Sequence, residues 1–157
     1  MNVLLVGPDL EENLSLGYLQ ASLERCGYSA TQARFNSPED VPHLLELALS
    51  ADIIGLSMSY QAFARDYLRI ACKIKKSAPW KIVIAGGGYA SCTAVELMEH
   101  HPEIDIVVIH EGEQTLCEVV DTLAASGGNL AGDLQSIQGI AYKSQEGIQI
   151  TPPRTKI

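Results

Sequence analysis

The sequence is poor in cysteine, and its cysteines lie far apart. Cys26, Cys72, Cys92 and Cys117 are separated from one another by at least 20 residues. This spacing excludes Cys-x-x-Cys zinc and redox motifs and the tight cysteine triplet of an iron–sulfur site. We therefore expect no iron–sulfur cluster and no metal ligands in this chain, and we predict reduced, mostly buried thiols in a cytoplasmic protein.

Basic residues and long apolar runs are also scarce. The 157 residues include 11 Lys and Arg against 19 Asp and Glu, which gives a formal net charge of −8. This charge argues against nucleic-acid and membrane partners, because both need a basic footprint. No apolar run approaches the roughly 20 residues that span a bilayer. The first seven residues also lack the basic start and long apolar core of a signal peptide.

Short apolar segments alternate with amphipathic ones along most of the chain. Runs of Val, Ile and Leu predict five strands, over residues 2–6, 28–35, 52–56, 81–85 and 104–109. Helical periodicity and capping residues predict a helix after each strand, over residues 15–26, 37–51, 63–77, 91–100 and 113–125. The expected fold is α/β and Rossmann-like (flavodoxin-like): a doubly wound five-stranded parallel sheet with helices on both faces.

The pattern changes after residue 128. Two short strand-like segments, over residues 139–143 and 147–151, predict a hairpin appended to the sheet edge. The remaining residues contain Pro152 and Pro153 and are typical of a linker. We therefore divide the chain into an α/β domain (1–128), a hairpin (129–151) and a linker (152–157) toward a downstream domain.

Two strand exits suggest a ligand site, because ligands of open parallel sheets bind beyond the carboxyl ends of the strands. The fourth strand ends in Gly86, Gly87 and Gly88, which allow turns closed to other residues and leave a surface without side chains. The third ends in Ser57 and Ser59. Purely structural alternatives are a tight turn at the glycines and capping of the next helix by the serines.

Several familiar phosphate and nucleotide sites do not fit. The chain has no Gly-x-x-x-x-Gly-Lys-Ser/Thr motif, and its glycine cluster follows the fourth strand instead of the first. The loop after the first strand contains Pro8 and three carboxylates, which disfavour a flavin phosphate. A phosphoacceptor receiver domain is disfavoured as well, because Ser57 and His110 occupy the places of its Asp and Lys.

An ordered set of motifs remains, and together it points to one family. The motifs are NVLLVG (2–7), LGYL (16–19), ADIIGLSMS (51–59), VIAGGG (83–88), DIVVIHEGEQT (105–115) and IQGIAY (137–142). In this order and spacing, the chain resembles the N-terminal cobalamin (B12)-binding domain of cobalamin-dependent radical S-adenosylmethionine enzymes. The resemblance covers nearly the whole chain. It implies a cobalamin-binding module without catalytic residues of its own, which serves a downstream or separate radical S-adenosylmethionine domain, with methyl transfer as a candidate reaction.

The resemblance also assigns roles to individual residues. Ser57 and Ser59 match the hydroxyl pair that lines the lower-face nucleotide tail of cobalamin. Gly86 and Gly87 match the glycine pair that lets the dimethylbenzimidazole pass close to the backbone, and residues 9–13 match the loop below the corrin. The full expected cofactor-binding set is Pro8, Asp9, Leu16, Ser57, Met58, Ser59, Gly86, Gly87, Gly88, Tyr89, His110, Glu111 and Gly112.

The chain departs from the family pattern at two places. Cobalamin-dependent mutases carry a cobalt-ligating His within Asp-x-His-x-x-Gly, whereas residues 9–13 here contain no His. We therefore expect cobalt to have no protein ligand on its lower face. At the fifth strand exit, His110 replaces the first glycine of Gly-Glu-Gly-Glu.

Two alternative functions remain open. One is a cofactor-free docking domain that keeps this fold and uses its acidic loops, residues 9–12 and 111–113, to contact a partner. The other is a small enzyme with His110 and Glu111 or Glu113 as acid and base. The sequence supplies neither a nucleophile nor a metal cluster for the second alternative.

Overall fold

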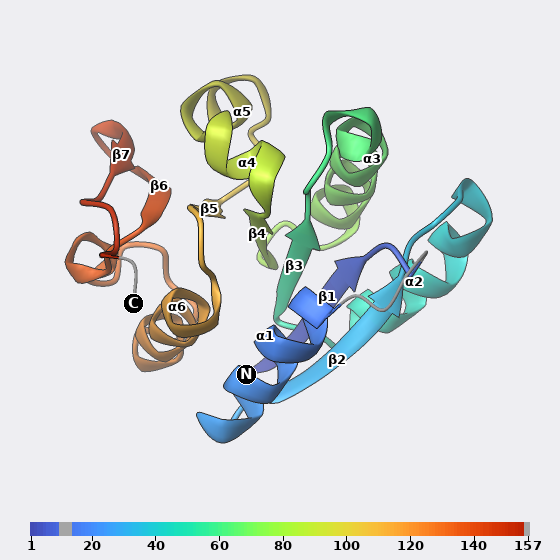
Figure 1. The fold of residues 1–157 in the computed structure, drawn as a ribbon, viewed down its shortest axis with the longest axis horizontal. Helices are drawn as coiled ribbons and strands as arrows, with labels where there is room; N and C mark the ends of the chain where they lie inside the picture. Colours follow the sequence, from blue (N-terminus) through green and yellow to red (C-terminus); the bar gives the residue numbers. More distant parts are fainter. Residues whose placement is uncertain (10–13, 156–157) are drawn as a thin grey trace.

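The computed structural model describes residues 1–9 and 14–155, and a seven-stranded sheet forms its centre (Figure 1). The first half of the chain forms β1 (Asn2–Gly7), α1 (Leu14–Arg25), β2 (Ser29–Arg34), η1 (Pro38–Asp40), α2 (Val41–Leu49), β3 (Ile53–Ser57) and α3 (Gln61–Ser77). The second half forms β4 (Ile82–Gly86), α4 (Gly88–Cys92), α5 (Ala94–His100), β5 (Ile106–Val108), α6 (Glu113–Ala125), η2 (Leu134–Ser136), β6 (Ile140–Ser144) and β7 (Gly147–Ile150).

The strand order is β2-β1-β3-β4-β5-β6-β7. Strands β1 to β5 are parallel, and the chain leaves β1 first toward β2 and then toward β3, so the order reverses beside β1. This confirms the α/β class and the parallel sheet. The sheet has seven strands where five were predicted, because the predicted hairpin joins the same sheet. Strand β6 pairs antiparallel with β5, and β7 pairs antiparallel with β6.

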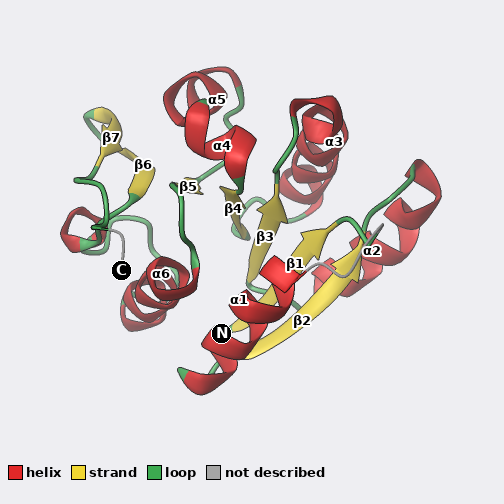
Figure 2. Ribbon diagram, viewed as in Figure 1, coloured by secondary structure: helices red, strands yellow, loops and turns green. Residues whose placement is uncertain are grey.

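Helices cover both faces of the sheet, as predicted (Figure 2). Alternate residues of each strand point to opposite faces. In β1, Leu4 and Val6 therefore join one core, whereas Val3 and Leu5 join the other. The first core lies beneath α2, α3, α4 and α5, and the second lies beneath α1 and α6. Each strand must thus satisfy two cores at once, which explains why the central strands are apolar throughout.

The helix predicted over residues 91–100 is divided in two and begins earlier. Helix α4 starts at Gly88, directly after the unusual backbone of Gly87, and the helical path breaks at Thr93, where φ is −119° and ψ is 18°. The Thr93 hydroxyl donates a hydrogen bond to the Tyr89 carbonyl at 2.8 Å. Threonine side chains compete for helix carbonyls in this way, and the result is a short helix, α4, directly after the β4 exit.

The sequence-based start signal at residues 37–40 is confirmed. Ser37 is the N-cap and Pro38 the first residue of η1, and α2 follows directly. The Asp40 carboxylate accepts hydrogen bonds from the backbone N–H groups of Asn36 and Ser37 at 2.9 and 3.2 Å. These bonds, the one from Asn36 foremost, lower the pKa of Asp40. Among the described residues, no helix is both long and apolar enough to cross a membrane.

Candidate functional site

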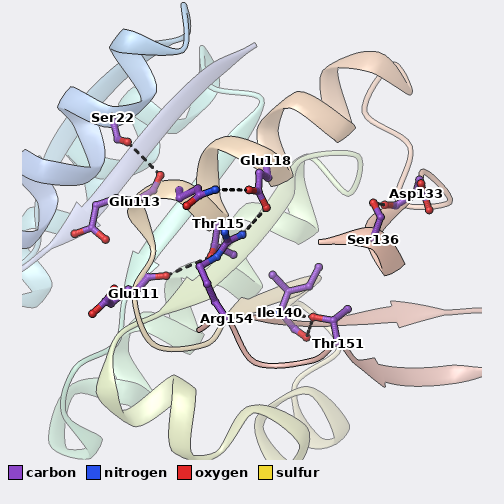
Figure 3. Close-up of polar contacts among 11 residues, drawn as sticks. Ser22, Glu111, Glu113, Thr115, Glu118, Asp133, Ser136, Ile140, Thr151 and Arg154 are labelled. Atoms are coloured by element: carbon purple, nitrogen blue, oxygen red, sulfur yellow. Dashed lines mark hydrogen bonds and ion pairs between the residues drawn. The ribbon is translucent and has the colours of Figure 1, made fainter. Parts of the chain in front are cut away.

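A pocket of about 200 Å³ lies at the carboxyl ends of β1, β3, β4 and β5. Its floor is the face of the sheet that α1 and α6 cover, and these two helices form its walls. Leu16 and Leu19 of α1 line one wall, and Leu116 of α6 lines the other. The Ser22 hydroxyl donates a hydrogen bond to the Glu113 carbonyl at 3.2 Å and links the two helices (Figure 3). Because the pocket includes the ends of β1 and β3, it lies where the strand order reverses, as expected for this class of sheet.

Small residues leave the pocket floor open. Gly55 and Ser57 of β3 and Gly86 of β4 line the floor. Their positions alternate with residues of the opposite core, so a side chain at 55 or 86 would project into the pocket. A Cβ atom added at Gly86 would meet only Val108, 3.9 Å away. The space above Gly86 is thus open within the described part of the structure.

Gly87 has a different role from Gly86. Its φ of 98° and ψ of 174° fall in a region that essentially only glycine adopts. A Cβ atom there would lie 2.9 Å from the Met58 carbonyl carbon and 3.0 Å from the Ser59 nitrogen. The sequence left two roles open for the glycine run, a tight structural turn and a surface open to a ligand. Gly87 has the structural role, because backbone packing between the β3 and β4 exits requires it, and Gly86 has the other, because it opens the pocket.

The serine hydroxyls at the β3 exit are not helix caps. Helix α3 begins at Gln61 with Tyr60 as its N-cap residue, so the capping alternative for Ser57 and Ser59 is wrong. Both serines line the pocket. Within the described part of the chain, neither hydroxyl has a hydrogen-bond partner. They are free to bind polar atoms of a ligand.

The β5 exit forms the remaining rim of the pocket, through His110, Glu111 and Gly112. His110 has a φ of 67°, in the left-handed region that usually holds glycine. Its backbone N–H donates a hydrogen bond to the Ser91 hydroxyl at 2.9 Å, which fixes this conformation. A Cβ atom at Gly112 would lie 3.2 Å from Leu19 Cδ2, so a larger residue there would press on the α1 wall.

Eight of the thirteen predicted binding residues line this pocket. They are Leu16, Ser57, Ser59, Gly86, Gly87, His110, Glu111 and Gly112. The other five lie outside the lining, and Met58 and Tyr89 lie toward the opposite face. The Met58 side chain is buried in the core beneath α3, and Tyr89 packs against that same core. Strand alternation explains this division, because Met58 lies between two serines that face the other way.

The remaining three predicted residues are displaced along the edge of the sheet. Gly88 is the first residue of α4. Asp9 lies beside the end of β2, where its N–H donates to Asn36 Oδ1 at 2.8 Å and its carboxylate lies 4.0 Å from Arg34. Pro8 precedes it on the same connection. The rest of the expected loop below the corrin, residues 10–13, lies outside the described residues.

Sequence reasoning missed the apolar floor and Gly55. Leu5, Ile84 and Val108 line the pocket together with Gly55. A signal for Gly55 was present, since it lies two residues before Ser57 in the same strand and therefore faces the same side. The described residues contain no group of three or more His, Cys, Asp or Glu side chains that could hold a metal ion. The lining of the pocket is largely apolar with a few hydroxyl groups, which suits an organic ligand held by shape and by a few polar contacts.

The fold and the pocket define a class: a doubly wound α/β domain with a pocket at the carboxyl edge of its sheet. The chain belongs to the B12-binding domain family, whose model matches residues 3–120. This membership confirms the resemblance that the ordered sequence motifs predicted.

The chain is also similar to curated proteins and to solved structures. The chain is 33% identical over 107 residues to an uncharacterized methyltransferase of Pyrococcus horikoshii, covering 68% of this chain and 22% of that protein. It is 26% identical over 138 residues to the hopanoid C-3 methylase of Methylococcus capsulatus, covering 87% of this chain and 26% of that protein. The chain thus spans about a quarter of the length of these relatives.

A solved structure shows the same fold over almost the whole chain. It is OxsB, a cobalamin-dependent S-adenosylmethionine radical enzyme with aqua-cobalamin and S-adenosylmethionine bound. The TM-score is 0.76 at 20% identity, and the match covers 99% of this chain and 22% of OxsB. The appended hairpin is therefore within the shared fold.

Proposed function

We propose that this domain binds cobalamin at the pocket between α1 and α6. The observation that carries the proposal is the open slot at the β3 and β4 exits. Gly86 leaves the floor open, Gly55 adds no side chain to it, and Ser57 and Ser59 beside it present hydroxyls that have no hydrogen-bond partner among the described residues. A flat aromatic group with polar substituents needs this combination of small walls and a few donors.

The size of the pocket indicates which part of the cofactor enters it. Clefts that enclose a drug-sized molecule measure roughly 300–1,000 Å³, whereas this one measures about 200 Å³. It therefore suits one projecting portion of the ligand, the nucleotide tail with its dimethylbenzimidazole, while the corrin rests outside on the carboxyl edge of the sheet. His110, Glu111 and Gly112 would then border the corrin from the β5 exit.

We further propose that the domain works as a cofactor carrier for a radical S-adenosylmethionine domain that is linked to it or encoded separately. Cobalamin bound here would supply the cobalt-centred chemistry of methyl transfer, and the protein would supply position and shielding. The relatives named methyltransferase and methylase support this reaction class. With no His in residues 9–13, cobalt would lack a protein ligand on its lower face.

The test is retention of hydroxocobalamin by the purified protein through gel filtration, read as a corrin absorption spectrum in the protein peak. Gly86→Val should abolish retention, because the added side chain projects into the slot where only Val108 is near. Gly17→Val is the matched control, since a Cβ at Gly17 on α1 meets nothing within 4 Å. A colourless wild-type protein peak would overturn the proposal and favour a cofactor-free docking domain.

A further inference from the structure

The segment after β7 forms neither helix nor strand, yet hydrogen bonds hold it against β6 and α6 (Figure 3). Thr151 is buried, and its hydroxyl accepts a hydrogen bond from the Ile140 N–H at 3.0 Å and donates one to the Ile140 carbonyl at 3.2 Å. The next contact follows at once, because the Gly139 N–H donates to the Pro152 carbonyl at 2.9 Å. Residues 151–154, which we name the C-terminal clasp, thus lie along the start of β6.

Arg154 fastens the clasp to α6. Its Nε donates to the Thr115 hydroxyl at 2.9 Å, and its Nη2 donates to the Glu118 carboxylate at 2.5 Å. The Arg154 side chain is only 16% exposed, whereas the Glu118 side chain is 37% exposed, so the guanidinium end of this charged pair is the one shielded from solvent. Thr115 is completely buried, and its hydroxyl donates in turn to the Glu111 carbonyl at 3.3 Å. A chain of hydrogen bonds therefore runs from Arg154 to Glu111, which lines the pocket.

A second route joins the clasp to the same part of the pocket. The Ile109 N–H donates to the Gly139 carbonyl at 2.8 Å, while the N–H of Gly139 holds Pro152. Gly139 has a φ of 78°, and a Cβ atom there would lie 3.4 Å from the Ile109 carbonyl oxygen and 3.6 Å from Arg154 Cβ. The clasp, Gly139 and the β5 exit are therefore packed against one another.

Both routes end on residues 109–111, around His110. A histidine in the left-handed region is less stable there than a glycine, so surrounding contacts must hold this backbone in place. The Ser91 hydroxyl supplies one such contact, and the two routes from the clasp supply the contacts on either side of His110.

We infer that Arg154 is a positioning residue for the pocket: through the clasp it holds the β5-exit rim in the conformation that accepts the ligand. As far as it concerns cobalamin, the inference rests on the proposed function. Linkage makes the coupling reciprocal, so that ligand binding tightens the clasp by the same factor by which the clasp improves binding. Arg154 itself lies outside the pocket lining.

The first test needs no ligand. In Arg154→Ala, amide hydrogen exchange at Ile109 and His110 should become about tenfold faster than in the wild type, while amides of β1 and β3 keep their rates. Arg65→Ala is the matched control: it removes one exposed arginine from α3, on the opposite face of the sheet, and should change neither. Unchanged exchange at the rim, or uniform acceleration across the whole sheet, would overturn the inference.

The second test is hydroxocobalamin affinity, measured by absorbance titration. Arg154→Ala should bind about tenfold more weakly, and Arg154→Lys should fall between, because lysine keeps the charge but not the planar fork that reaches Thr115 and Glu118 together. If Arg154→Ala does not fold, Arg154→Lys carries both tests. Equal affinity of the variants and the wild type would overturn the inference. If the wild type binds no cobalamin, the proposed function fails, and the exchange data alone decide the role of the clasp.

Discussion

Two adjacent glycines should respond in opposite ways to the same substitution. In Gly87→Ala, the new methyl group would meet backbone atoms of the β3 exit at 2.9 to 3.0 Å, in a conformation with φ of 98° that disfavours any side chain. Such backbone strain costs about 1–3 kcal/mol, and overpacking adds about 1–3 kcal/mol. We expect a loss of about 2–6 kcal/mol, a large part of the roughly 5–15 kcal/mol of a typical domain.

In Gly86→Ala the methyl group meets only ordinary contact distances, 3.9 Å to Val108, and no positive φ is involved. Alanine within a strand is if anything more stable than glycine, by about 0.5–1 kcal/mol. The same methyl group enters the pocket, so we expect unchanged or higher stability together with weaker hydroxocobalamin binding.

Urea unfolding followed by far-UV circular dichroism measures the stability of both variants, and absorbance titration measures binding. The reasoning fails if Gly87→Ala loses less than about 1 kcal/mol, or if Gly86→Ala is the more destabilised of the two. Either result would mean that the close backbone contact between Gly87 and the β3 exit can relax. Gly87 would then not be required for backbone packing, and its role would not differ from that of Gly86.

Two further predictions concern buried polar groups. Tyr67 is 3% exposed, burial raises its pKa, and its hydroxyl has no hydrogen-bond partner among the described residues. Tyr67→Phe should therefore raise the free energy of unfolding, measured by urea titration, by about 1 kcal/mol. A decrease in the free energy of unfolding would reveal a partner for the hydroxyl. The prediction of mostly buried thiols is wrong, because Cys26 and Cys92 are exposed and only Cys117 is buried. Burial also raises the pKa of Cys117 to about 11, so Ellman's reagent at neutral pH should label Cys26 and Cys92 quickly and Cys117 only after denaturation. Labelling of native Cys117 at the rate of Cys26 would contradict its burial.

Much of the fold followed from local pattern. The helix Glu113–Ala125 was predicted with its observed bounds, because an apolar stripe of period 3.6 marks its inner face. The ends of the strands were predicted to within two residues, because apolar runs of this length suit elements buried on both sides. The division of α4 from α5 at Thr93 was not predicted, since it depends on a single side chain that bonds back to Tyr89.

The site was predicted less completely, for a geometric reason. Sequence reasoning took whole strand exits as the site, and so included Met58 with Ser57 and Ser59. In a strand, however, neighbouring residues face opposite sides, and only the helices packed on each face decide which side holds the pocket. The same ambiguity concealed Gly55.

By itself, the sequence determined the alternating β–α order, the position of the glycine and serine exits and the family, because these depend on residues close together in the chain. Only the tertiary structure decided that α1 and α6 enclose the pocket, that Gly87 is structural while Gly86 is open, and that Arg154 reaches Thr115 and Glu118. Each of these depends on residues that are distant in sequence, which only the packing of complete layers brings together. The triple glycine is one motif in the sequence and performs separate tasks in the folded protein.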